Sequence, residues 1–141
     1  MGSKATSFRL SEQVHARLRE HARQEGVAIR VLLEQLVEEG IEARRHPGIV
    51  HRGRPGARRA ALAAGPDVWE VMDAMRFVEG SPEERIAAVA RSMDLHPRQV
   101  RLAVEYAASH ADEIDGLVEE NDRAAREASA AAEARSRYLG S

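Results

Sequence analysis

The chain has 141 residues, 43% of them hydrophobic, and a net charge of −2, which suits one ordinary domain or two small ones. It contains no cysteine, so disulfides and thiolate metal sites are excluded. No apolar run approaches the roughly 18 residues that span a bilayer, and no signal peptide is recognised. We therefore expect a cytoplasmic protein with no membrane partner.

The charge is divided unevenly along the chain. Through Leu62 there are twelve Lys and Arg against seven Asp and Glu, whereas from Ala63 onward there are nine against sixteen. The front of the chain thus carries +5 and the rear −7. A basic front joined to an acidic rear is typical of a protein that binds a polyanion with one end only.

The first element predicted in chain order is a short strand that ends at Leu10. Apolar Phe8 and Leu10 alternate with Ser7 and Arg9, as in a strand with one buried face. No other strand candidate follows within about forty residues, so its backbone groups need an edge from elsewhere. The simplest supplier is the same strand of a second copy, paired antiparallel across a two-fold axis. Such a ribbon fits the major groove of DNA.

Two helices are predicted after this strand. Ser11 is suited to cap the first and Gly26 to end it, and Val14, Leu18 and Ala22 form its apolar stripe. The second helix closes at His46-Pro47-Gly48 and has a broad apolar face formed by Leu32, Leu33, Leu36, Val37 and Ile41. About forty-five residues with so few apolar groups do not build a stable core alone. Dimerisation is therefore expected.

The strand–helix–helix order over residues 4–45 resembles the ribbon-helix-helix repressors, the class of Arc and MetJ. The resemblance is carried by Ser7-Phe8-Arg9-Leu10, Ser11, the pair Val14 and Leu18, Gly26-Val27 and the run from Leu32 to Val37. It implies a dimer that reads DNA base edges with the outward side chains of the strand. Those readers are Ala5, Ser7 and Arg9, and the dimer core is Phe8, Leu10, Leu32 and Leu36.

The same resemblance implies a phosphate site at the start of the second helix, around Ala28, Ile29 and Arg30, with Lys4 nearby. One residue departs from the family pattern, because members usually have Ser or Thr where this chain has Ala28. Alanine cannot accept the free N–H groups of a first helical turn. Arg30 would then hold the phosphate directly.

Residues 47–65 read as a basic hairpin. A strand over Gly48 to His51 and a return strand within Ala57 to Leu62 flank a turn at Gly53-Arg54-Pro55-Gly56. The segment has no acidic residue and carries Arg52, Arg54, Arg58 and Arg59. It could lie along a phosphate backbone, a contact that weakens with salt, or it could be a solvated linker.

Residues 66–116 are predicted to form a helical domain. Helices start at Pro66-Asp67, at the cap Ser81-Pro82 and after the turn Asp94-Leu95-His96-Pro97. The last two have helix-turn-helix spacing, with Asp94 tolerating a left-handed conformation. If this pair reads DNA, the residues facing the groove are His96, Arg98, Gln99 and Arg101. Residues 63–116 carry five basic and eleven acidic groups, which repel phosphate.

The hairpin and helices over about 49–115 look like the DUF433 family, which is associated with bacterial antitoxins. The matching segments are Gly53-Arg54-Pro55, Pro66 to Val71, Gly80 to Glu84 and Val100 to Ala107. About ten extra residues precede Val68 here. Residues 117–141 continue as an acidic, then alanine-rich helix or tail, which is either solvated or the place where a toxin protein is bound.

The expected architecture is mainly α, divided into residues 1–46, the hairpin 47–65, the helical domain 66–116 and the C-terminal helix or tail 117–141. We expect a homodimer, or a higher oligomer on DNA, acting as a sequence-specific repressor of double-stranded DNA and as an autoregulating antitoxin. A regulator without a toxin and a helical interaction module are the alternatives. HExxH, phosphate-loop and nucleophile-elbow motifs are missing, so neither enzyme activity nor a cofactor is expected. His46 and His51 flank the hairpin without forming a predicted metal site.

Overall fold

The computed structural model describes residues 2–140 and is mainly helical. Within those residues it has six helices and one two-stranded antiparallel sheet. The predicted mainly α class is confirmed. The ribbon of the ribbon-helix-helix arrangement needs a second chain and stays a prediction. None of the helices in the described chain is both long and apolar enough to cross a membrane.

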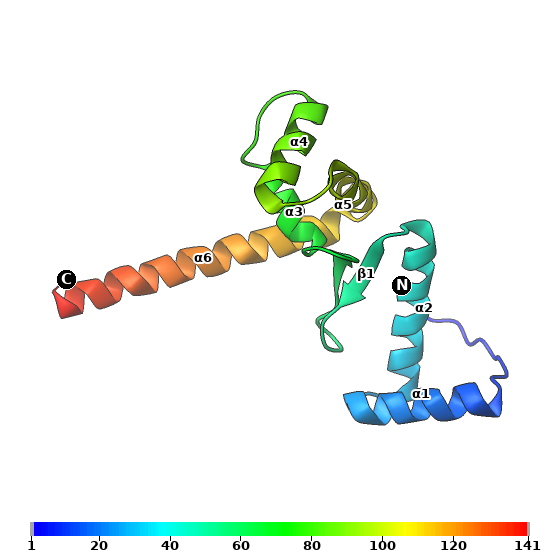
Figure 1. Ribbon diagram of the computed structural model, residues 1–141. Coiled ribbons are helices and arrows are strands. Elements are labelled where there is room, and N and C mark those ends of the chain that lie inside the picture. Colours follow the sequence, from blue (N-terminus) through cyan, green and yellow to red (C-terminus); the bar gives the residue numbers. More distant parts are fainter. Residues whose placement is uncertain (1, 141) are drawn as a thin grey trace.

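The first two helices, α1 (Glu12–Glu25) and α2 (Ile29–Arg45), form an N-terminal unit in which α1 lies across the start of α2 (Figure 1). The caps are as predicted: Ser11 Oγ accepts a hydrogen bond from the Val14 N–H at 3.2 Å, and Gly26 ends α1 in the left-handed region with φ 71°. The buried core of this unit contains only Leu18, Ala22 and Leu32, with Val27 packed against it.

Large apolar side chains remain exposed on this unit. We call seven of them the N-terminal apolar face: Phe8, Leu10, Val14, Leu33, Leu36, Val37 and Ile41. Between 40% and 84% of each of these residues is exposed, Phe8 being the most exposed. The predicted broad face of α2 is therefore present, but only Leu32 of that helix is buried within the chain. Leu32, expected in the dimer core, lies in the buried core between α1 and α2 of the chain itself, and its part in a dimer stays a prediction.

The hairpin pairs β1 (Ile49–Arg52) with β2 (Arg59–Leu62), in the register Ile49 to Leu62 and Arg52 to Arg59. Its inward side chains Ile49, Ala60 and Leu62 belong to the main hydrophobic core. The interpretation of residues 47–65 as a solvated linker is therefore wrong. The segment is a structural part of the second domain, because three of its apolar side chains are buried there.

Most of that core comes from three helices, α3 (Val68–Met75), α4 (Pro82–Met93) and α5 (Pro97–Ser109). Ser81 caps α4 by accepting from the Glu84 N–H, and Asp94 ends it in the left-handed region at φ 54° and ψ 50°. Both features were predicted and are confirmed. The core buries Val68, Val71, Val89, Val100, Ala103 and Tyr106, among others, nearly completely. We call the hairpin with α3 to α5 and the start of the next helix the helical domain.

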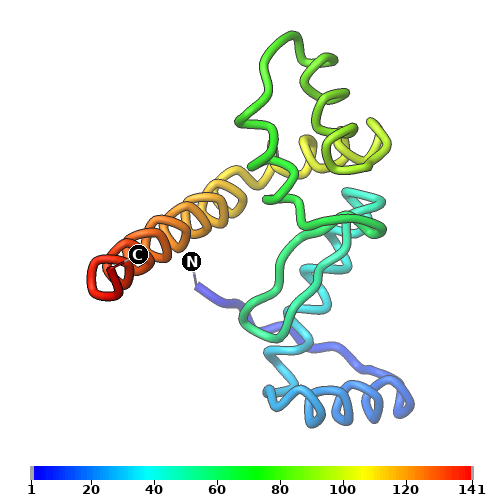
Figure 2. The backbone as a smooth tube through the Cα atoms, turned by 60° about the vertical axis from the view of Figure 1, so that its left-hand side comes forward, coloured from blue at the N-terminus to red at the C-terminus, as the bar shows by residue number. Residues whose placement is uncertain are grey.

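The last helix, α6 (Ala111–Leu139), starts inside the helical domain and projects away from it (Figures 1 and 2). Ile114 near its start is buried in the core. Arg76, at the end of α3, contacts α6 further along the helix. Its guanidinium nitrogens lie 3.0 and 2.9 Å from the two carboxylate oxygens of Asp122. The expected boundary between residues 116 and 117 thus falls within one continuous helix.

Candidate nucleic-acid interface

Residues 2–10 form neither helix nor strand and are exposed throughout. They run back beside α2, separated from it by a hollow of about 560 Å³ that Lys4, Ala5, Thr6 and Phe8 line together with Arg30. Leu10 lines a different hollow, of about 350 Å³, between α1 and α2. Ser7 and Arg9 line neither.

Phe8 and Leu10 border these hollows, while Ser7 and Arg9 do not. The consecutive residues Lys4, Ala5 and Thr6 all border one hollow, and no strand forms here within the single chain, so the alternation of a ribbon strand stays a prediction. Ala5 differs from the prediction, because it borders the same hollow as Phe8 rather than sharing the side of Ser7 and Arg9.

The first turn of α2 has the two features that its sequence predicts, the absence of a side-chain cap and an exposed arginine. Ala28 is the N-cap in an extended conformation, and no side chain caps the first turn. Arg30 projects into solvent with 75% of its side chain exposed and forms an ion pair with Glu34 at 3.2 Å. An exposed pair of this kind contributes little to stability, so Arg30 can exchange Glu34 for another anion at little cost. The N–H groups at Ile29 and Arg30 lie at the positive end of the helix dipole.

The basic hairpin is different, because three of its four arginines have partners within the chain. Arg58 donates to both carboxylate oxygens of Glu39, at 3.0 and 2.6 Å, and to the carbonyls of Gly53 and His51. This hydrogen-bonded pair raises the pKa of the Arg58 guanidinium.

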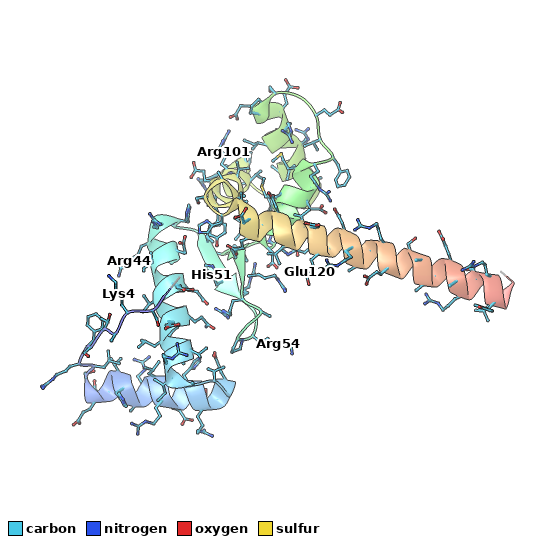
Figure 3. The ribbon with its side chains drawn as sticks, turned by 180° about the vertical axis from the view of Figure 1, so that it is seen from behind. Lys4, Arg44, His51, Arg54, Arg101 and Glu120 are labelled. Atoms are coloured by element: carbon cyan, nitrogen blue, oxygen red, sulfur yellow. The ribbon has the colours of Figure 1, made fainter. Side chains whose placement is uncertain are left out.

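Arg52 and Arg59 of the hairpin are also engaged within the helical domain. Arg52 donates to the carbonyls of Leu62 and Gly65, and Arg59 donates to Asp67 at 2.9 Å. The Arg54 guanidinium makes no hydrogen bond or ion pair with the rest of the described chain, and Arg54 lies at the tip of the hairpin, where its carbonyl accepts from the Ala57 N–H (Figure 3). Of the four arginines predicted to contact phosphate, Arg54 is the most available.

The residues predicted for a second DNA-reading helix are largely used within the fold. His96 and Gln99 form a capping box at the start of α5: the His96 ring accepts from the Arg98 N–H, and Gln99 Oε1 accepts from the His96 N–H. Arg101 is paired with Glu83 of α4. Figure 3 places Arg101 on the helical domain, well separated from Lys4 beside α2. The two predicted DNA surfaces therefore do not form one continuous patch.

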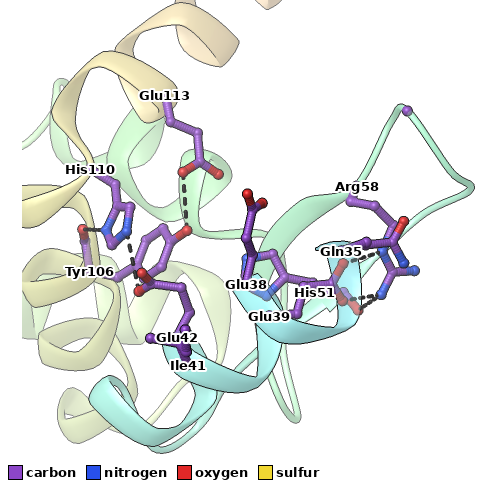
Figure 4. Close-up of a pocket in the computed structure, with 11 residues that line it drawn as sticks. Gln35, Glu38, Glu39, Ile41, Glu42, His51, Arg58, Tyr106, His110 and Glu113 are labelled. Atoms are coloured by element: carbon purple, nitrogen blue, oxygen red, sulfur yellow. Dashed lines mark hydrogen bonds and ion pairs between the residues drawn. The ribbon is translucent and has the colours of Figure 1, made fainter. Parts of the chain in front are cut away.

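A polar hollow of about 520 Å³ lies where α2, the hairpin and the corner between α5 and α6 meet (Figure 4). Its carboxylates outnumber its single guanidinium: Glu38, Glu39, Glu42 and Glu113 against Arg58. Such a site repels phosphate and attracts cations.

Tyr106 forms the floor of this hollow and is itself 1% exposed. Its hydroxyl donates to Glu113 at 3.0 Å, and its ring stacks on the His110 ring with centroids 4.0 Å apart. Burial, together with the neighbouring Glu113 carboxylate, raises the pKa of Tyr106. The hydroxyl therefore stays protonated and remains a hydrogen-bond donor.

The sequence pattern did not indicate a further cluster at this corner, formed by Glu42, His46 and His110. Along the chain His46 and His51 flank the hairpin, and His110 lies far from both. In the structure the residues beside His46 are Glu42, one helical turn earlier, and His110 from the α5–α6 corner. The spacing Glu42-x-x-x-His46 could have identified two of the three residues, because residues four apart share a helix face.

Comparison with known proteins adds no relative. No family model matches the chain, and the searches of curated proteins and of solved structures also give no match.

Proposed function

We propose that this chain is a dimeric, sequence-specific DNA-binding repressor that acts as the antitoxin of a toxin–antitoxin pair. The N-terminal apolar face is the observation that carries the proposal. Seven large apolar side chains that are each at least 40% exposed, set beside a core of three buried residues, favour a unit completed by a partner. The second copy of the same unit is the partner, and pairing of residues 5–10 from the two copies supplies their missing backbone hydrogen bonds.

The charge distribution supports DNA as the ligand of this dimer. The basic side chains of the front half that remain free for phosphate are concentrated on the N-terminal unit, where Lys4, Arg9 and Arg30 are exposed. Arg9 would form two parallel hydrogen bonds to a guanine, worth roughly 1–3 kcal/mol of discrimination. We assign the reading role to Ser7 and Arg9, with Ala5 in a secondary position, and the phosphate role to Lys4, Arg30 and the first-turn amides of α2.

The acidic rear half supports a protein partner rather than a second DNA contact. The part of α6 beyond Asp122 projects from the domain, and its side chains are almost all exposed. A long solvated helix with few large apolar groups is marginally stable in isolation. It would become more ordered on a partner, and we propose a toxin bound by the C-terminal half.

An electrophoretic mobility shift assay on the DNA upstream of the chain's own reading frame tests the DNA-binding role. Arg9→Ala should reduce the preference for that DNA over random DNA by about 10-fold or more, because one bidentate base contact is lost. Arg126→Ala on α6 removes the same charge far from the proposed ribbon and should leave the preference unchanged. Equal selectivity in both variants would refute the reader assignment.

Salt dependence gives a second readout of the same complex. Each neutralised phosphate contributes roughly −0.9 to the slope of log affinity against log salt, so a dimer with several contacts should bind far less at high salt. A flat response would rule out DNA as the ligand.

The toxin role is tested by co-expression with the product of the neighbouring reading frame and co-purification with the full chain or with a chain ending at Asp122. Loss of the partner in the shorter chain is expected, and equal capture would place the partner elsewhere.

A further inference from the structure

The cluster of Glu42, His46 and His110 joins the N-terminal unit to the helical domain. Glu42 lies in the last turn of α2, His46 is the residue that ends this helix, and His110 lies at the corner between α5 and α6. Their side chains are only 20%, 18% and 21% exposed. One potential ligand atom from each residue lies within 4.8 Å of the other two. Three potential metal ligands from two separate parts of the chain therefore converge at one partly shielded point.

The atoms that face one another in this cluster are potential metal ligands. Oε2 of Glu42 is buried and accepts no hydrogen bond within the described chain, although His110 Nε2 lies 3.2 Å away. Nδ1 of His110 lies 3.0 Å from the Tyr106 carbonyl oxygen and 3.1 Å from Ser109 Oγ. In the neutral tautomer in which Nδ1 donates to that carbonyl, the lone pair of Nε2 faces the Glu42 carboxylate and is available to a cation, whereas in the other tautomer Nε2 carries the proton. A metal ion between the two atoms would select the first tautomer.

The surroundings hold the His110 imidazole in place, as is typical of metal sites, where a hydrogen bond at the other ring nitrogen fixes the ligand ring. The carbonyl of Tyr106 lies beside Nδ1 of His110, and the Tyr106 ring stacks on its face. The His46 ring meets the edge of Tyr106 with centroids 5.2 Å apart. Its Nε2 lies 3.3 Å from Ser109 Oγ, a contact that metal binding would replace. Both imidazoles thus direct Nε2 toward the Glu42 carboxylate (Figure 4 shows Glu42 and His110).

The spacing of these atoms fits a tetrahedral ion. Two ligands about 2.1 Å from a tetrahedral zinc ion are about 3.4 Å apart. The distance from Glu42 Oε2 is 3.2 Å to His110 Nε2 and 3.8 Å to His46 Nε2. The ligand atoms of His46 and His110 lie within 4.8 Å of each other, so these side chains would move closer together to make all three bonds, and a water molecule from the adjoining polar hollow would be the fourth ligand.

We propose that Glu42, His46 and His110 bind one divalent transition-metal ion, with Zn²⁺ as the best fit. Two imidazole nitrogens and one carboxylate oxygen are a known zinc ligand set, whereas Mg²⁺ and Ca²⁺ prefer oxygen ligands alone. Glu42 and His46 lie at the end of α2, and His110 lies at the α5–α6 corner. The bound ion therefore connects the N-terminal unit to the helical domain. This site is independent of the proposed DNA-binding role.

Thermal unfolding of the full chain, stripped with EDTA and dialysed, provides the test. At free Zn²⁺ about one hundred times the dissociation constant, we expect the melting temperature to rise by about 5–10 °C. Isothermal titration calorimetry should give one zinc ion per chain. Mg²⁺ at the same concentration should shift the melting temperature by less than about 1 °C, because two of the three ligands are nitrogen atoms.

Three variants localise the effect. Glu42→Gln keeps the shape of the side chain and removes the charged ligand, so it should fold and lose at least 10-fold in zinc affinity. His110→Ala should lose the zinc response as well. His51→Ala removes an imidazole that lines the same polar hollow but lies outside the ligand triad, and it should retain wild-type affinity and stoichiometry.

The pair of His21 and Glu25 on α1, whose side chains are 56% and 26% exposed, serves as the internal measure of binding outside the triad, because it has the same two residue types four positions apart and remains in every variant. Zinc that still binds to Glu42→Gln with full affinity would therefore come from such surface pairs and would overturn the proposal. The absence of any zinc-induced shift in the wild-type chain would also overturn it. A shift of equal size with Mg²⁺ would exclude the nitrogen-ligand site.

Discussion

The N-terminal unit and the helical domain differ in how completely each buries its own apolar side chains. The helical domain encloses thirteen buried residues contributed by both strands and four helices. The N-terminal unit encloses three and leaves Phe8, Leu36 and Val37 between 48% and 84% exposed. Similar local sequence features built both parts, since each has capped helices with an apolar stripe. The helical domain thus buries its apolar side chains within one chain, whereas the exposed apolar face of the N-terminal unit is the basis of the proposal that a second copy completes it.

The two parts are nevertheless connected by specific polar contacts. Glu39 of α2 pairs with Arg58 of the hairpin, and Glu42 of the same helix lies 3.2 Å from His110. A rigid connection would fix the helical domain relative to a dimer of N-terminal units. The proposed DNA-binding surface and the projecting α6 would then have a defined relative orientation.

The largest expected effect comes from placing a charge on the N-terminal apolar face. Leu36→Glu should weaken dimerisation by at least 10³-fold, because two uncompensated carboxylates would be buried at the two-fold interface. Sedimentation velocity over a range of protein concentrations measures this directly. Leu139→Glu makes the same change at a site that is 78% exposed on α6, so its assembly should match that of the wild type. A wild-type chain that remains monomeric at all concentrations would remove the distinction between the two regions.

The next largest effect tests the opposite property of the helical domain. Leu62→Ala should lower the free energy of unfolding by about 2–5 kcal/mol, because Leu62 is 1% exposed and the truncation leaves a cavity. Urea unfolding monitored by the fluorescence of Trp69, which packs against this core, reports the change. The loss should be the same at every protein concentration. A loss that shrinks as protein concentration rises would mean that this core also depends on a partner.

Local chemistry accounts for what the sequence could predict. Ser11, Gly26, Ser81 and Asp94 mark helix ends through their own side chains or backbone preferences, and the structure places helix boundaries at all four. The short strand segment around Ile49, the turn and the return strand that ends at Leu62 similarly identified the hairpin. These features depend on residues a few positions apart, which sequence patterns record directly.

Contacts between distant segments were not predictable in the same way. The arginines of the hairpin looked free because their partners, such as Glu39 for Arg58 and Asp67 for Arg59, depend on how the hairpin packs. His110 similarly reaches Glu42 only after α5 and α6 have been placed against α2. The candidate DNA-contacting residues were selected by sequence pattern, and their role stays a prediction.

A smaller effect is expected at the connection between the two regions. Arg58→Ala and Glu39→Gln each break the ion pair, whose side chains are 28% and 18% exposed. A double-mutant cycle should give a coupling free energy of about 1 kcal/mol, because the pair is bidentate but partly solvated. Unfolding in urea supplies the four stabilities. Zero coupling would mean that the N-terminal unit and the hairpin are held together by other contacts.

The smallest effect concerns the pH dependence of the helical domain alone. Burial and the neighbouring Asp67 carboxylate raise the pKa of Glu70, so its folded-state pKa lies above its unfolded value. Such a group favours folding at low pH, and this contribution is lost as the pH rises through the folded-state pKa. Glu70→Gln should therefore raise the melting temperature at pH 7 by about 1–2 °C and change it little below pH 4, where the carboxyl is protonated in both states. Glu79→Gln, at an exposed position in the loop after α3, should show no such difference between the two pH values. Because Glu70 lies outside the N-terminal unit, the effect should persist in Leu36→Glu, and its disappearance there would show that the stability of the helical domain depends on the dimer.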